Sequence, residues 1–295
     1  MANQISQIST ITVLGAGTMG RGIAHVAALA GYGTRLYDTD GAALKKAEAS
    51  IHRNLAKGVE LKKVDAGAAE RARANLALHQ NLSEAVEDTH LVIEAVPEDV
   101  ALKIQIFHAV AIHAPEEAIF ASNTSALSIT EMAAGSGRPE RFAGMHFFNP
   151  VHVMKLIELV RGLQTSQETI DALREVGVRM GKEMVLVNEA PGFVTSRINA
   201  LIGNEAFRML QEGVASAEDI DKALKLGLNH PMGPFEMVDL VGLDVRLSIL
   251  EFLHRSLGEA FRPNQILIQH VRAGRLGRKV GRGVYSYDEN GNRVG

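Results

Sequence analysis

The strongest constraint on this chain is a glycine motif, G-x-G-x-x-G, formed near its start by Gly15, Gly17 and Gly20. A short apolar, β-branched run, Ile8–Leu14, precedes the motif, and a run with helical periodicity, Thr18–Ala30, follows it. A strand, a glycine turn and a helix form the first half of a βαβ unit, in which helices cover a parallel sheet. The motif therefore predicts an α/β protein with a phosphate-binding turn.

A second predicted strand, Thr34–Asp38, ends in an acid eighteen residues after Gly20. In a dinucleotide-binding unit, Gly15 permits the tight turn, Gly17 lets the backbone approach a pyrophosphate, and Gly20 lets the helix pack closely on the strand. Asp38 would accept hydrogen bonds from the adenosine ribose. The other motif residues that we expect to contact this cofactor are Ala16, Thr18 and Met19.

The acid also indicates which nicotinamide dinucleotide is preferred. A carboxylate repels the 2′-phosphate of NADP, and selectivity for NADP usually needs a nearby Arg. Arg35 lies three residues before Asp38 in the predicted strand, where its side chain does not obviously reach the ribose. We therefore predict that the cofactor is NAD.

Strand-like and helical runs keep alternating over the first two thirds of the chain, which predicts a Rossmann-type, mainly parallel sheet. After Asn188 the strands almost stop, and helical runs such as Val194–Leu210 and Phe235–Leu257 follow. We predict a Rossmann domain that binds NAD over residues 1–188 and a smaller, all-helical domain for substrate and dimer contacts over residues 189–295. The later strands that we expect are Asn75–His79, Leu91–Val96, Ala118–Ser122, Phe142–Phe148, Leu156–Val160 and Met184–Val187.

Charge and composition argue against several classes of protein. The net charge is −3 and the pI is about 6.4, so no basic field favours nucleic acid or an anionic membrane surface. No apolar stretch is long enough to span a membrane and the N-terminus lacks a signal pattern, so we expect a cytoplasmic protein. The sequence has no cysteine, and its eleven histidines lack metal-ligand spacing, so we expect neither disulfides nor a metal site.

Several longer phrases of the sequence are typical of one enzyme family. They are Ser122-Asn-Thr-Ser125, Arg141-Phe-Ala-Gly-Met-His-Phe-Phe-Asn-Pro150, Met154-Lys-Leu-Ile-Glu-Leu-Val160, Pro191-Gly-Phe193, Pro231-Met-Gly-Pro-Phe-Glu236 and Gly281-Arg-Gly-Val-Tyr285. Through them nearly the whole chain resembles the L-3-hydroxyacyl-CoA dehydrogenases. The resemblance implies NAD-dependent oxidation of a short L-3-hydroxyacyl-CoA such as 3-hydroxybutyryl-CoA, in fatty acid metabolism.

The resemblance also implies a catalytic site around His146. Oxidation of a hydroxyl needs a base whose pKa is near neutral, which a histidine supplies. By resemblance His146 is this base, and Glu158, twelve residues later, orients it. Apart from the motif, His146 could be an ordinary buried residue and Glu158 could face solvent. The family pattern makes Ser125 a contact of the substrate oxygen and the cofactor, and Asn149 a polar positioning group, although Ser and Asn are also common in turns.

Further matches concern the two large ligands. The resemblance assigns Glu98, Lys103 and Lys279 to the cofactor, and Lys57, in a long amphipathic helix, to the coenzyme A of the substrate. Glu and Lys at such positions are otherwise ordinary solvated residues. Ser196 holds a place where family members carry an asparagine of the substrate site, so we expect a retained but altered polar contact there, unless Ser196 simply continues the helix surface.

Two alternatives stand beside the short-chain acyl-CoA dehydrogenase. One is the same fold acting on a sugar acid or on a dicarboxyl acyl-CoA such as 3-hydroxyadipyl-CoA. The other is a non-catalytic, structural NAD-binding protein, which the intact set of His146, Glu158 and Ser125 argues against. The second domain is too small to bury all its apolar helix faces alone, which predicts a homodimer through that domain.

Overall fold

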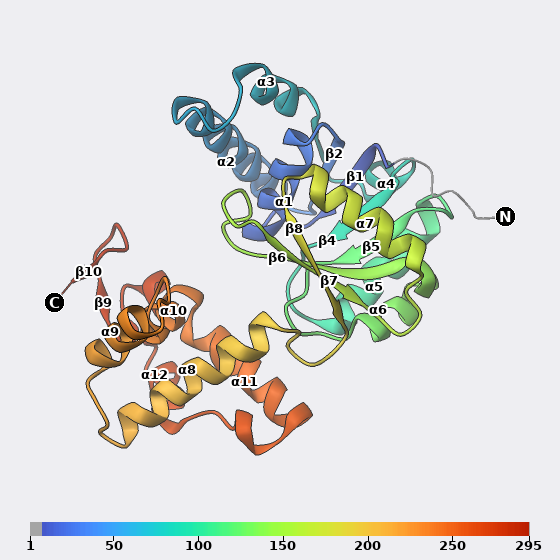
Figure 1. Cartoon of the computed structure of the whole chain (residues 1–295). Coiled ribbons are helices and arrows are strands. Elements are labelled where there is room, and N and C mark those ends of the chain that lie inside the picture. The colour runs from blue at the N-terminus through green and yellow to red at the C-terminus, as the bar shows by residue number, and fades with distance from the viewer. Residues whose placement is uncertain (1–7, 295) are drawn as a thin grey trace. The chain divides into compact units, whose positions relative to one another are not determined.

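The computed structural model describes residues 8–294. The chain divides into two compact units, of which the first ends at Ala190 and the second begins at Pro191. Figure 1 shows the first unit from blue to yellow and the second from yellow to red. Among residues 8–294, no helix is both long and apolar enough to cross a membrane.

An eight-stranded sheet forms the centre of the first unit, with the strand order β3-β2-β1-β4-β5-β6-β7-β8 (Figure 1). The first six strands run parallel, β7 is antiparallel to β6, and β8 is parallel to β7. The predicted mainly parallel, Rossmann-type sheet is therefore confirmed. The strands are β1 (Thr10–Leu14), β2 (Gly33–Tyr37), β3 (Leu76–His79), β4 (Leu91–Glu94), β5 (Ile119–Ser122), β6 (Phe142–Phe147), β7 (Leu156–Arg161) and β8 (Glu183–Asn188).

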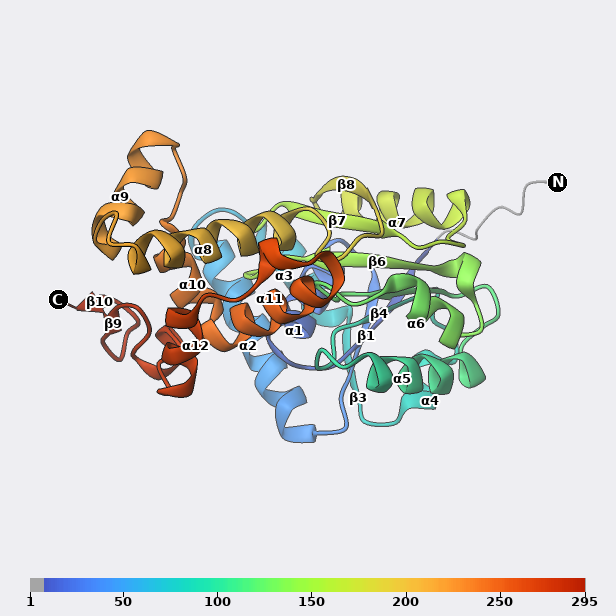
Figure 2. The same ribbon diagram turned by 90° about the horizontal axis from the view of Figure 1, so that it is seen from below.

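Helices cover both faces of this sheet (Figures 1 and 2). On one face, Val13 of β1 shares a core with Ile23 of α1 and Ile170 of α7. On the other face, Phe107 of α5 meets Phe142 of β6 edge-on, with 4.7 Å between the ring centroids. The helices of this unit are α1 (Thr18–Leu29), α2 (Gly41–Glu60), α3 (Ala66–Ala74), α4 (Leu82–Val86), α5 (Val100–His113), α6 (Ile129–Gly135) and α7 (Gln167–Arg179).

The second unit is mainly helical. Its helices are α8 (Thr195–Gln211), α9 (Ala217–Gly227), α10 (Pro234–Val241), α11 (Leu243–Leu257) and α12 (Gln265–Arg272). Phe207 of α8 and Phe235 of α10 pack edge-to-face in its core, 5.1 Å apart. The helical character that the sequence predicted for this part of the chain is confirmed, with two corrections.

The first correction concerns the helix predicted over Phe235–Leu257, which is two helices. Gly242 separates α10 from α11 with a φ of 107°, a conformation that glycine adopts readily and other residues rarely do. The second correction is that the unit is not all helical, because β9 (Ser286–Tyr287) and β10 (Arg293–Val294) form a short antiparallel hairpin. Asp288 stabilises its turn by accepting the backbone N–H of two residues within it.

A buried carboxylate, Asp239 of α10, ties this helix to the C-terminal segment. It is 1% exposed and accepts hydrogen bonds from the backbone N–H of Val284 at 2.8 Å and of Tyr285 at 2.9 Å, and from the Tyr287 hydroxyl at 2.9 Å. Burial and the adjacent Asp239 charge raise the pKa of the Tyr287 hydroxyl, which therefore stays protonated and donates. These three donors satisfy the Asp239 carboxylate, which explains how an acid is accommodated in this core.

Candidate active site

The turn between β1 and α1 has the shape of a phosphate cradle. Gly15 has a φ of 97°, and a Cβ on Gly20 would lie 1.7 Å from the Gly15 carbonyl oxygen. A Cβ on Gly17, in contrast, would have no atom within 4 Å. Gly15 and Gly20 are therefore needed for the turn and its packing, whereas Gly17 leaves open space beside the backbone at the start of α1, where unpaired N–H groups attract an anion.

A cavity of about 760 Å³ adjoins this turn. Its walls include Thr18 and Met19 of α1, Asp38 at the end of β2, and Pro97 after β4. The Asp38 carboxylate is fixed in place, since its Oδ2 accepts the Ala16 N–H at 2.7 Å and its Oδ1 accepts the Asp40 N–H at 2.9 Å. Its remaining lone pairs suit ribose hydroxyl donors, and the cavity has the size of a cofactor site.

His146 and Glu158 face each other across the only antiparallel pairing of the described eight-stranded sheet. They are directly opposed in the β6–β7 register, and His146 Nδ1 lies 2.8 Å from Glu158 Oε2. Both side chains are buried, with exposed fractions of 6% and 1%, and the His146 ring packs against Phe148 at 4.4 Å between centroids. An N–H on Nδ1 would donate to this carboxylate, and in that tautomer Nε2 carries the lone pair that a base needs.

The predicted polar residues Ser125, Glu98 and Asn149 follow the carboxyl ends of neighbouring parallel strands. The backbone N–H of Ser125 donates to Glu98 Oε1 at 2.9 Å, which joins the loop after β5 to the loop after β4. Asn123 also binds the end of β6, through its Oδ1 and the Phe147 N–H at 2.9 Å. Open α/β sheets bind ligands at this edge. Asn149 follows β6 at the same edge, two residues after Phe147.

Lys103, which the resemblance assigns to the cofactor, is buried, so the alternative of an ordinary solvated lysine at a helix start does not hold. It is 1% exposed, and its Nζ lies 2.6 Å from Glu94 Oε1 and 3.2 Å from Glu98 Oε2. Glu94, a residue that no sequence pattern indicated, also accepts the Ser122 hydroxyl at 2.6 Å. Burial raises the pKa of Glu94, and Lys103 opposes that effect. A direct contact of Lys103 with the cofactor stays a prediction, whereas its support of the Glu98 loop is observed.

Three other predicted ligand contacts lie apart from this group in the sequence. Lys57 is exposed on α2 and pairs with Glu60 at 2.9 Å. Lys279 pairs with Asp244 at 2.6 Å, within the second unit. Ser196 lies half-buried in the first turn of α8. Their roles toward cofactor and substrate stay predictions.

Two family models together match almost all of the described chain. The model for the NAD binding domain of 3-hydroxyacyl-CoA dehydrogenase matches residues 10–190, and the model for the C-terminal domain of the same enzyme matches residues 192–287. The two matches divide where the two compact units divide.

Individual proteins are similar over the full length. The chain is 44% identical over 281 residues to 3-hydroxybutyryl-CoA dehydrogenase of Bradyrhizobium diazoefficiens, covering 95% of this chain and 96% of the relative. It is 45% identical to the probable 3-hydroxybutyryl-CoA dehydrogenase of Bacillus subtilis, and the match covers 96% of this chain and 99% of that relative. Among solved structures, (S)-3-hydroxybutyryl-CoA dehydrogenase PaaH1 from Ralstonia eutropha aligns with a TM-score of 0.91 at 42% identity, covering 96% of this chain and all of the other.

Proposed function

Because the chain belongs to the 3-hydroxyacyl-CoA dehydrogenase family, we propose that it oxidises the 3-hydroxyl of a short L-3-hydroxyacyl-CoA, above all 3-hydroxybutyryl-CoA, to a ketone. NAD is the cofactor of this family's N-terminal domain. The observation that carries the proposal is the buried His146–Glu158 pair. A structural NAD-binding protein has no need of such a pair, because burying it costs free energy.

The residues of this chain transfer the proton of the 3-hydroxyl and orient the reacting groups. When bound, NAD accepts the hydride that leaves C3 of the substrate. His146 Nε2 takes the proton of the 3-hydroxyl, and Glu158 stabilises the resulting imidazolium through Nδ1. The Ser125 hydroxyl hydrogen-bonds the same substrate oxygen, and the Glu98 carboxylate holds the Ser125 loop in place. In the reverse reaction His146 gives the proton back.

The geometry of the glycine turn fits NAD. Its diphosphate would lie beside Gly17, where the open space and the start of α1 receive it. The adenosine ribose would bind Asp38, whose carboxylate is already oriented by two backbone N–H groups. Ala16, Thr18 and Met19 would line the same site.

Substitution of Asp38 by Ala should weaken NAD binding and narrow the preference for NAD over NADP. The substitution removes the ribose acceptor and the charge that repels a 2′-phosphate. Losing hydrogen bonds to a charged group corresponds to roughly a tenfold or larger loss in NAD specificity constant. The measurement is kcat/KM for both cofactors in wild type and Asp38→Ala, with Asp88→Ala, a surface acid, as control. A wild-type preference for NADP would overturn the assignment.

A series of substrates tests the proposed chain length. We expect kcat/KM to be highest for 3-hydroxybutyryl-CoA and to fall for longer monocarboxyl chains. A higher kcat/KM for 3-hydroxyadipyl-CoA than for 3-hydroxybutyryl-CoA would instead favour the dicarboxyl alternative.

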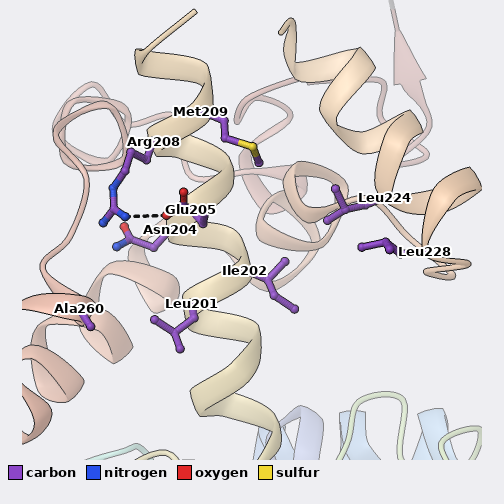
Figure 3. A pocket seen from close by; sticks show the side chains of 9 residues that line it. All are labelled: Leu201, Ile202, Asn204, Glu205, Arg208, Met209, Leu224, Leu228 and Ala260. Atoms are coloured by element: carbon purple, nitrogen blue, oxygen red, sulfur yellow. Dashed lines mark hydrogen bonds and ion pairs between the residues drawn. The ribbon is translucent and has the colours of Figure 1, made fainter. Parts of the chain in front are cut away.

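The second unit carries an apolar groove that supports a homodimer. The groove has a volume of about 450 Å³ and lies between α8 and α9. Figure 3 shows Ile202 and Met209 of α8 pointing toward Leu224 and Leu228 beside the groove. Leu228 is 66% exposed and Ile198, on the same helix as Ile202, is 54% exposed. We propose that a second copy of the chain covers this surface, because exposed apolar patches mark interaction sites.

Light scattering at micromolar concentration should return twice the chain mass of 31.8 kDa. Leu228→Glu places a charge in the groove and should shift the protein to the monomer. Leu163→Glu, at an 84% exposed position of the first unit, is the matched control and should leave the dimer intact. A wild-type mass equal to one chain would contradict the proposal.

We also propose that the protein acts in the cytoplasm. Both ligands assigned to it, NAD and an acyl-CoA, are charged metabolites that require carriers to cross a membrane. Dehydrogenase activity should therefore appear in the membrane-free fraction of lysed cells, and activity confined to the membrane or external fraction would contradict this location.

A further inference from the structure

A buried ion pair, Glu94 with Lys103, lies behind the loops that carry the predicted cofactor and substrate contacts. Glu94 ends β4 and is 0% exposed. Its Oε1 accepts hydrogen bonds from Lys103 Nζ at 2.6 Å and from the Val96 N–H at 2.7 Å. Its Oε2 accepts the hydroxyl of Ser122, the last residue of β5, at 2.6 Å. These donors satisfy a carboxylate in the interior and join the ends of two neighbouring strands.

Glu98 shares Lys103 with Glu94 but lies farther from it. The Lys103 Nζ is 2.6 Å from Glu94 Oε1 and 3.2 Å from Glu98 Oε2. The Glu98 side chain is 45% exposed, and its Oε1 accepts the Thr124 hydroxyl and the Ser125 N–H. Two carboxylates and one ammonium leave this group with an excess of negative charge. Because Glu94 is the closer partner of Lys103, the excess falls mainly on Glu98.

The surroundings of Glu94 favour its charged form against the cost of burial. Burial raises the pKa of the Glu94 carboxyl, and Lys103, followed by the Ser122 hydroxyl and the Val96 N–H, opposes that rise. Three donors aimed at one carboxylate stabilise its anion. The ammonium of Lys103, which is 1% exposed, in turn needs a close anion in the interior.

We propose that Glu94 is a positioning residue of the active site. By neutralising Lys103, it leaves Glu98 as an anion that holds the Ser125 loop and favours NAD over NADH. The inference rests on the proposed function, in which the hydride passes from the substrate carbon to the nicotinamide. The nicotinamide therefore binds next to the groups that contact the 3-hydroxyl, among them Ser125. Its ring is cationic in NAD and neutral in NADH, so a nearby anion stabilises the oxidised form.

Equilibrium titrations with NAD and with NADH test this inference without any substrate, through the ratio of the NADH dissociation constant to the NAD dissociation constant. Glu94→Gln keeps the size of the side chain, removes its charge and leaves Lys103 to neutralise Glu98. We expect the ratio to fall about two- to fivefold. Turnover should fall about tenfold or more, because Glu98 moves toward Lys103 and releases the Ser125 loop. Glutamine would mimic a protonated Glu94, so an unchanged ratio would overturn the inference.

The double variant Glu94→Gln/Lys103→Met separates the charge effect from a loss of folding. It removes both members of the buried pair, which a core tolerates better than one unpaired charge, and it returns the net charge of the group to that of wild type. We expect the ratio to return to the wild-type value while turnover stays low, because Lys103 no longer supports Glu98. A contact of Lys103 with the cofactor diphosphate would weaken both forms alike and cancels in the ratio.

Ser122→Ala is the matched control, because it removes a buried hydrogen bond of Glu94 and leaves the ion pair intact. It should lower the stability and leave the ratio unchanged. A ratio that Ser122→Ala shifts as far as Glu94→Gln, or a double variant that keeps the ratio of Glu94→Gln or regains wild-type turnover, would contradict the inference. If Glu94→Gln does not fold, the double variant decides alone. NADH formation from 3-hydroxybutyryl-CoA tests the proposed function separately, since the two titrations need no acyl-CoA.

Discussion

Substitution of His146 by Gln should lower turnover by about 10²–10⁴-fold, because it removes the group that takes the hydroxyl proton. Glutamine keeps much of the volume of the ring and offers polar atoms to Glu158, so the strand pairing between β6 and β7 should persist. The affinity for NAD should change little, since the glycine turn and Asp38 are untouched. Steady-state kinetics and a cofactor titration on the same preparation provide both numbers.

Glu158→Gln supplies the companion variant. It keeps the size of the side chain but removes the charge that stabilises an imidazolium. Since the two residues act as one unit, the double variant should be little slower than His146→Gln alone. Near-full activity of His146→Gln would refute the assignment of the base, and multiplicative losses in the double variant would refute the coupling of the pair.

Substitution of Asp239 by Ala should lower the free energy of unfolding by about 3–5 kcal/mol, the largest stability effect that we predict. The substitution leaves two backbone N–H groups and the Tyr287 hydroxyl without an acceptor in a buried site. It also detaches the C-terminal segment from α10. Urea unfolding, followed by a probe in the second unit, measures the change.

Asp219→Ala is the matched control for this prediction. Asp219 is exposed on α9 of the same unit and interacts with Ser216, so its loss should cost about 0.5 kcal/mol or less. A cost for Asp239→Ala as small as that of Asp219→Ala would show that Asp239 does not hold the C-terminal segment.

The sequence predicted the fold of the first unit because its periodic patterns are strong and local. The β1–α1–β2 unit follows from the glycine motif and the acid at Asp38, and each glycine has the steric role expected of it. The break at Gly242 was missed because the apolar pattern continues through it from α10 to α11. The β9–β10 hairpin was missed because a strand of two residues leaves no detectable period.

The candidate site was only partly predictable. The pairing of His146 with Glu158 came from a resemblance, and the structure brings the two side chains together through the β6–β7 register. The partnership of Glu94 with Lys103 was not predicted, although an acid at the end of an apolar strand needs a buried partner.

The most direct test of the central assignment is product analysis of the purified wild-type protein with NAD and L-3-hydroxybutyryl-CoA. We predict that NADH and acetoacetyl-CoA appear together in equal amounts. His146→Gln, assayed in parallel, should form both products at a rate about 10²–10⁴-fold lower. Failure of the wild-type protein to form NADH, or NADH formation that His146→Gln leaves unchanged, would contradict the assignment of the His146–Glu158 pair as the acid-base centre of this dehydrogenase.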